Sequence, residues 1–200
     1  MNRNREKIGT RRSGPTLEVS PVMSSQPALT SIETDMLMRF ALGEAERGLR
    51  AGETPIGCVV VVPGEHGLRI VGRGHETSAA GHEGHAVKAA LAGAVGRRRP
   101  GESGIVVVST VEPCEACMEL IQEAPSRQLV YGLSLPTGSG ERRIAMERDS
   151  HSLISVGGIR ANDCRDLLYS FLKASGHAPV AVAFVEQIVR RAQRHAFHAA

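Results

Sequence analysis

The segment Thr110-Val111-Glu112-Pro113-Cys114-Glu115-Ala116-Cys117 carries the strongest structural signal in this 200-residue chain. It follows the apolar run Ile105–Ser109, whose β-branched residues are typical of a strand buried on both faces. Pro113 favours the first turn of a helix, so Cys114 and Cys117 would lie on one face of that turn. The segment therefore predicts a buried strand that runs into a short helix with two thiols side by side.

A histidine opens the helix before this strand, which is predicted over His85–Val95. Imidazole and thiolate groups suit Zn²⁺. Three protein ligands with a vacant fourth position are typical of catalytic sites, whereas structural sites use four. The start of a helix also favours negative charge, which helps cysteines to bind as thiolates. We therefore predict a zinc site formed by His85, Cys114 and Cys117.

Two other interpretations fit the Cys-x-x-Cys spacing. A redox pair has the same spacing, but it normally follows a thioredoxin-like strand and has no companion histidine. A structural zinc site needs a fourth ligand, for which His82 is the candidate. The remaining cysteines, Cys58 in an apolar run and Cys164 in a late helix, are expected to be core thiols.

Strand-like and helix-like segments alternate along the chain. Thr30-Ser31-Ile32-Glu33 is a capping box that begins a helix ended by Gly52. Strands are predicted at Ile56–Val62, Leu68–Arg73, Ile105–Ser109, Gln128–Gly132 and Ser152–Val156, and further helices at Cys114–Ala124, Asn162–Ala174 and Pro179–His195. The alternation predicts an α/β protein, a three-layer α/β/α sandwich around a mixed five-stranded sheet. We expect a disordered basic tail over 1–29, a zinc domain over 30–176 and a C-terminal helical extension over 177–200.

The composition of the chain argues against several classes of protein. The formal net charge is +3, aromatic residues make up 3% of the chain, and tryptophan is absent. A protein that stacks single-stranded bases needs more aromatic side chains on a basic surface, so RNA is not expected as a partner. No apolar run reaches the roughly 20 residues of a membrane span. With no secretory pattern at the N-terminus and few cysteines, we expect a cytoplasmic protein without membrane contact.

The same residues resemble the zinc-dependent nucleobase and nucleoside deaminases, which have the cytidine-deaminase fold. The resemblance runs from about Asp35 to Phe171. Thr110–Cys117 is close to the zinc motif of that family, whose signature is H-x-E…P-C-x-x-C. Gly52–Val60 resembles the strand-entry motif that lines the base pocket, and Gly72–His75 resembles the end of the next strand.

The resemblance implies a reaction and the residues for it. His85, Cys114 and Cys117 match the three zinc ligands, and zinc would activate water to replace the amino group of a base by oxygen. In this family a glutamate two residues after the histidine carries the proton, and this chain has Val87 there. Because valine cannot carry a proton, we expect the activity to be impaired. Glu83, on a loop two residues before His85, is the candidate for a substitute base.

The resemblance also indicates which residues would contact the substrate. The backbone N–H groups of Ala86 and Cys58 fall where the main chain of the family touches the base, and Ile56 lies in the same pocket motif as Cys58. Glu76 stands where the family usually has an asparagine that holds the sugar or the base. Because a carboxylate only accepts hydrogen bonds, substrate recognition is expected to differ from that of the family.

Two main functions follow as hypotheses. The first is a zinc-dependent deaminase that removes an amino group from a nucleobase, a nucleoside or a related amino-heterocycle, with its activity impaired at Val87. The alternative is an inactive zinc-binding pseudoenzyme that binds a ligand or serves as an oligomer partner. For both we expect a small-molecule amino-heterocycle as the ligand, a homodimer, and no RNA. A third hypothesis, an RNA-associated subunit with a basic tail that resembles the tRNA-editing deaminases, is disfavoured by the few aromatic residues and the small net charge.

Overall fold

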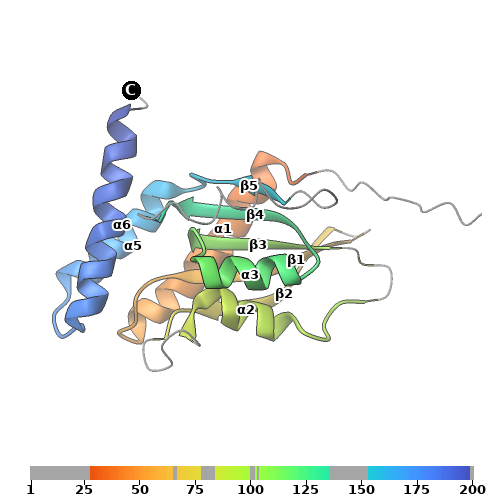
Figure 1. The fold of residues 1–200 in the computed structure, drawn as a ribbon, viewed down its shortest axis with the longest axis horizontal. Coiled ribbons are helices and arrows are strands. Elements are labelled where there is room, and N and C mark those ends of the chain that lie inside the picture. The colour runs from red at the N-terminus through yellow and green to blue at the C-terminus, as the bar shows by residue number, and fades with distance from the viewer. Residues whose placement is uncertain are drawn as a thin grey trace, which may run out of the picture.

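Helices cover both faces of one central sheet, which gives the predicted α/β/α sandwich (Figure 1). The computed structural model describes residues 28–64, 67–77, 84–99, 102, 104–135 and 153–198, with side chains as far as residue 194. One face carries α2 (Ala86–Ala94) and α3 (Glu115–Glu123), and the other carries α1 (Ser31–Arg50) and α5 (Ala161–Lys173). The last helix, α6 (Pro179–His198), packs against α5.

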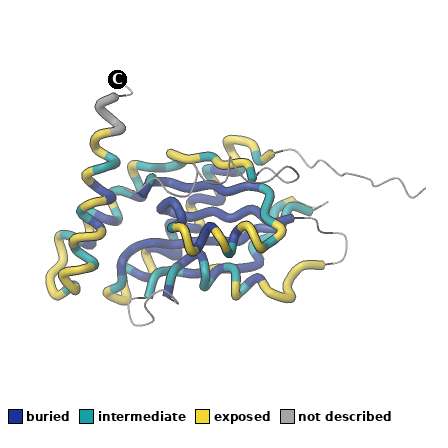
Figure 2. The backbone as a smooth tube through the Cα atoms, in the orientation of Figure 1, coloured by how far each residue is buried: buried dark blue, intermediate teal, exposed yellow. Residues whose placement is uncertain are grey.

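The sheet is mixed and has five strands in the order β2-β1-β3-β4-β5. The strands span Gly57–Gly64 (β1), Gly67–His75 (β2), Ile105–Val111 (β3), Ser126–Leu133 (β4) and Ile154–Val156 (β5). β1 is antiparallel to β2 and β3, whereas β3, β4 and β5 are parallel. Figure 2 shows the middle strands buried, because the valine-rich runs of β1 and β3 pack against helices on both sides.

Helix α1 begins at the predicted capping box. The Glu33 backbone N–H donates to Thr30 Oγ1 at 3.3 Å, and the Thr30 N–H donates to Glu33 Oε2 at 2.8 Å. The bond from the Thr30 N–H, and then a 2.8 Å bond that the Thr30 hydroxyl donates to Glu33 Oε2, lower the pKa of Glu33. The helix then buries Leu37, Met38 and Ala41 against the sheet, so both its start and its inward face follow from the sequence.

Glycines in β2 allow α2 to lie directly on the strand. A Cβ atom on Gly72 would collide with the backbone carbonyl of Ala90, and one on Gly74 would collide with the backbone of α2 near Ala86. Because His85 immediately precedes α2, this close approach sets how deeply the histidine sits over the sheet.

Gly72→Ala is expected to lower the free energy of unfolding by about 1–3 kcal/mol, because α2 or β2 must move to admit the methyl group. The matched control is Gly43→Ala on α1, where a Cβ would meet nothing within 4 Å. There the substitution should stabilise the helix by roughly 0.5–1 kcal/mol. Urea unfolding measures both variants, and equal midpoints for the two would contradict the close packing of α2 on β2.

The predicted strands and helices are present, with ends that shift by a few residues. Residues 1–27 of the predicted tail lie outside the described residues, and the proposed boundary between 176 and 177 stays a prediction. Within the described part of the chain, no helix combines the length and the apolar character needed to cross a membrane.

Candidate functional site

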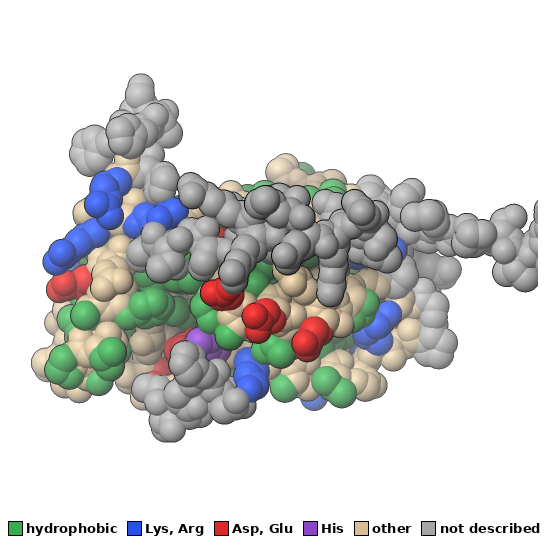
Figure 3. Space-filling view, viewed as in Figure 1, with side chains coloured by type: hydrophobic (Ala, Val, Ile, Leu, Met, Phe, Trp, Pro, Cys, Tyr) green, Lys and Arg blue, Asp and Glu red, His purple; other side chains and the backbone are tan. Residues whose placement is uncertain are grey.

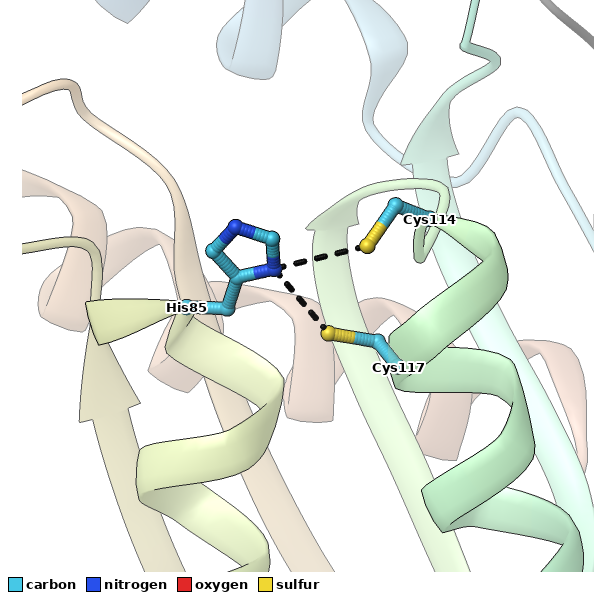
Figure 4. Close-up of side chains that lie close together, drawn as sticks. All are labelled: His85, Cys114 and Cys117. Atoms are coloured by element: carbon cyan, nitrogen blue, oxygen red, sulfur yellow. Dashed lines mark hydrogen bonds between the residues drawn. The ribbon is translucent and has the colours of Figure 1, made fainter. Parts of the chain in front are cut away.

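Two helix starts converge on one face of the sheet (Figure 4). His85 is the N-cap residue of α2, Cys114 is the N-cap residue of α3, and Cys117 lies within the first turn of α3. The Nδ1 atom of His85 lies 3.4 Å from the Sγ atom of each cysteine. All three potential ligand atoms lie within 4.8 Å of one another. The structure thus brings together the three residues that the sequence predicts as a metal site.

The spacing of these atoms fits a tetrahedral zinc ion. Zinc bonded to an imidazole nitrogen at about 2.0–2.1 Å and to a thiolate at about 2.3 Å holds the two ligand atoms about 3.6 Å apart. The observed separation of 3.4 Å is close to this value. Within the described residues the cluster has three members, which leaves one tetrahedral position for water or substrate. Zinc held in this way would supply activated water for a hydrolysis.

The surroundings of the two cysteines favour a thiolate at one of them, and the thiolate is the form that binds metal. Hydrogen bonds from the Cys117 side chain and backbone, helped by nearby His85, lower the pKa of Cys114 to about 5 despite partial burial. The pKa of Cys117 is raised, because its proton is held by the Cys114 sulfur and because the residue is buried. One thiolate is therefore present at neutral pH, and metal binding requires the loss of one further thiol proton.

The other two cysteines behave as core residues, as predicted. Cys58 has an exposed fraction of 0% and Cys164 of 2%, and both lie in the hydrophobic core. Burial raises the pKa of Cys58, and it raises the pKa of Cys164 to about 12. Neither belongs to the metal-binding cluster.

The residue at the position of the expected catalytic glutamate is apolar, and its surroundings in the structure are apolar too. Val87 lies on α2 with an exposed fraction of 3% and belongs to the hydrophobic core. Its side chain has no group that can donate or accept a proton. The predicted substitute Glu83, and the possible fourth ligand His82, lie outside the described residues.

A different carboxylate, Glu76, lies beside the histidine. Its Oε1 atom is 3.9 Å from His85 Nε2, and its Oε2 atom accepts a hydrogen bond of 3.2 Å from the Ala86 backbone N–H. The backbone N–H of Glu76 donates to the Ile56 carbonyl at 2.9 Å, which fixes the residue just past β2. Burial raises the pKa of Glu76, while His85 and the Ala86 N–H act in the opposite direction.

The residues predicted to bind substrate are only partly accessible. Ile56 is 8% exposed, the Cys58 side chain is enclosed in the core, and the Ala86 N–H is engaged by Glu76. Their contacts with a substrate therefore stay predictions. The contact between Glu76 and His85 was not predicted, since the sequence gives no pattern that links a carboxylate at a strand end to a histidine beyond a loop.

Glu112, another carboxylate near the zinc helix, has a structural role. It is 5% exposed, and its Oε2 atom accepts a hydrogen bond of 2.8 Å from the Leu135 backbone N–H. This bond joins the end of β3 to the chain just beyond β4, and so holds the loop that leads to Cys114.

The fold and the cluster together are those of the zinc-binding deaminase family, which has the cytidine-deaminase fold. The model of the cytidine and deoxycytidylate deaminase zinc-binding region matches residues 32–133. The chain belongs to this family.

Several relatives act in tRNA modification. A tRNA-specific adenosine deaminase of Streptococcus pyogenes is 32% identical over 150 residues, which cover 70% of this chain and 91% of the relative. A tRNA(Ile)-lysidine synthase of Deinococcus deserti is 35% identical over 140 residues, 67% of this chain. The match covers only 26% of that synthase, so it concerns one part of a much longer protein.

Solved structures give the same fold. One from a study of A-to-I editing by tRNA:A34 deaminases superposes with a TM-score of 0.55 at 27% identity, covering 66% of this chain and 98% of that one. A bifunctional diaminohydroxyphosphoribosylaminopyrimidine deaminase/reductase of Thermotoga maritima gives a TM-score of 0.56 at 24% identity. That match covers 68% of this chain and 39% of the enzyme, and it supports the fold alone.

The prediction of a small-molecule partner without RNA is wrong, whereas the predicted homodimer stays a prediction. The sequence pointed to a small amino-heterocycle and away from RNA, but relatives that match most of the domain are tRNA-specific deaminases. The inference from few aromatic residues assumed a row of stacked bases. A deaminase instead takes a single flipped base into its pocket, which does not require an aromatic platform.

Proposed function

We propose that this chain holds zinc at His85, Cys114 and Cys117 and takes up an amino-bearing base of an RNA at the open side of the metal. The family reaction at this place replaces the amino group by oxygen. The observation that carries the proposal is the three-member cluster, whose histidine side chain is 24% exposed and thus reachable from solvent. A structural zinc site has four protein ligands, so it leaves no metal position that solvent or substrate can reach.

The surface charges favour one direction of approach for RNA. Exposed acidic residues follow α3 at Glu115, Glu119 and Glu123, and Figure 3 shows acidic side chains in a row on this face. Phosphates would be repelled there. Arg190, which pairs with Glu186 at 3.0 Å, and Arg194 are exposed on α6, and basic side chains gather at that end of the same view. We therefore place the RNA backbone on the α6 side of the metal.

Turnover by the native chain is expected to be slow, because Val87 cannot carry the proton from water to the base. Positioned acid–base groups contribute about 10²–10⁴-fold to such reactions. A second candidate function is therefore binding of the base without hydrolysis. The buried Val87, which has no group to carry a proton, favours this alternative.

The test uses the full chain loaded with zinc and a mixture of unmodified tRNA transcripts. Fluorescence anisotropy at several salt concentrations should show RNA binding that weakens as salt rises. Nucleoside chromatography of the same RNA after long incubation should show slow formation of deaminated bases. Binding without product would favour the second candidate over the first, and absence of RNA binding at low salt would overturn both.

A further inference from the structure

We propose that Glu76 is a positioning residue that orients His85 for the metal. This inference rests on the zinc role proposed above for His85, and it gives Glu76 a function different from the substrate contact predicted from the sequence. The supporting observation is that different partners lie on the two opposite sides of one imidazole ring.

The two ring nitrogens of His85 face different partners. Nδ1 lies 3.4 Å from both Cys114 Sγ and Cys117 Sγ, so it is the nitrogen that points toward the metal position. Nε2 lies 3.9 Å from Glu76 Oε1. When a histidine binds a metal through one nitrogen, the other carries a proton, and a carboxylate commonly accepts it. Glu76 lies on the side where such an acceptor belongs.

The carboxylate is held in place by the same helix start that presents the histidine. Its second oxygen, Oε2, accepts the 3.2 Å bond from Ala86, the residue that follows His85. Its backbone is tied to Ile56 by the 2.9 Å bond to that carbonyl. The side chains of Glu76 and His85 are 21% and 24% exposed, so the interaction of the carboxylate with the Nε2 side of the ring is only partly screened by water.

Two other roles fit the geometry less well. Glu76 does not belong to the cluster of potential ligand atoms, so it is not a fourth metal ligand in the structure. The separation of 3.9 Å is longer than a direct hydrogen bond, so the proposed effect of Glu76 on the ring in this structure comes from its charge near the Nε2 side. A substrate contact would have to compete with Ala86 for Oε2, since that oxygen is already engaged.

The test is the zinc affinity of the full chain, measured by competition with a chromophoric chelator. Glu76→Gln keeps the shape of the side chain but removes its charge and one acceptor. We expect zinc affinity to fall by about 10–100-fold, as for other carboxylates that support a ligating histidine. Glu119→Gln, which removes an exposed charge from the same face, is the matched control and should keep the native affinity.

Cobalt substitution distinguishes a defect in the orientation of His85 from a general loss of the metal site. The thiolate-to-cobalt charge-transfer band should persist in Glu76→Gln, because both cysteines still bind, while the affinity falls. Glu76→Asp, which retains the charge on a shorter side chain, should lie between the native chain and Glu76→Gln. Unfolding of the metal-free variants identifies any loss of fold.

The outcomes distinguish this inference from the proposed function. Native zinc affinity in Glu76→Gln would overturn the positioning role and leave the zinc site intact. Loss of the thiolate band in that variant would also overturn it, because the defect would then involve the cysteines. If the native chain bound no zinc, the proposed function itself would fail.

Discussion

Replacing Val87 by glutamate is expected to raise the rate of base deamination by about 10²–10⁴-fold over the native chain. The change restores a carboxylate two residues after His85, on the helix that presents this histidine to the metal position. In the family signature this is the position from which a glutamate moves a proton between water and the base. Deaminated nucleosides in a tRNA mixture, quantified for equal amounts of zinc-loaded protein, measure the effect.

The matched control for this gain is Val87→Gln, which has the same size as the glutamate variant but cannot carry a proton. Because Val87 is 3% exposed, both variants place a polar group in the core and should lose stability, the glutamate variant more because its carboxyl can ionise. Only the glutamate variant should gain activity. Equal rates for the native chain and Val87→Glu would show that a missing proton carrier is not what limits this protein.

Replacing Cys117 by serine is expected to abolish zinc binding and the stabilisation that zinc provides. Native protein with free zinc at 100 times its Kd should gain about 2.7 kcal/mol. For a domain of this size, that corresponds to an increase in melting temperature of about 5–10 °C. Cys117→Ser should show no such increase, because an alcohol is a far poorer zinc ligand than a thiolate.

Cys164→Ala is the control for the loss of a buried thiol. It removes a core cysteine that is 2% exposed and lies outside the metal cluster. This variant should be less stable overall but should keep the full zinc-dependent increase in melting temperature. A zinc response that survives in Cys117→Ser would contradict the ligand assignment.

Local rules were enough to predict the elements that build the site. The capping box at Thr30 sets the start of α1, and the valine-rich runs form the buried strands β1 and β3. The metal cluster was predictable for the same reason, because a histidine and a Cys-x-x-Cys pair each lie at a helix start. Helix α6 runs on to His198, beyond the predicted end, because no glycine or proline follows to stop it.

Contacts that depend on how strands pair and how helices pack on them could not be predicted in this way. Glu76 reaches His85 only because Gly57 pairs with His75 at the end of β2 and because α2 lies so close to that strand. The likeness to tRNA-specific deaminases was disfavoured by the sequence alone, in part because a net charge of +3 is a sum over the chain. It hides the separation between the acidic row on α3 and the arginines of α6.

X-ray absorption at the zinc edge of the purified full chain is the sharpest test of the three-residue zinc site, since it counts the ligands of the metal. We expect about one zinc per chain, with two sulfur ligands at about 2.3 Å and two nitrogen or oxygen ligands at about 2.0–2.1 Å. Those sulfurs would be Cys114 and Cys117, the nitrogen would be His85, and the remaining oxygen would belong to solvent. A chain without zinc, or a zinc ion with three or four sulfur ligands, would contradict the open three-residue site.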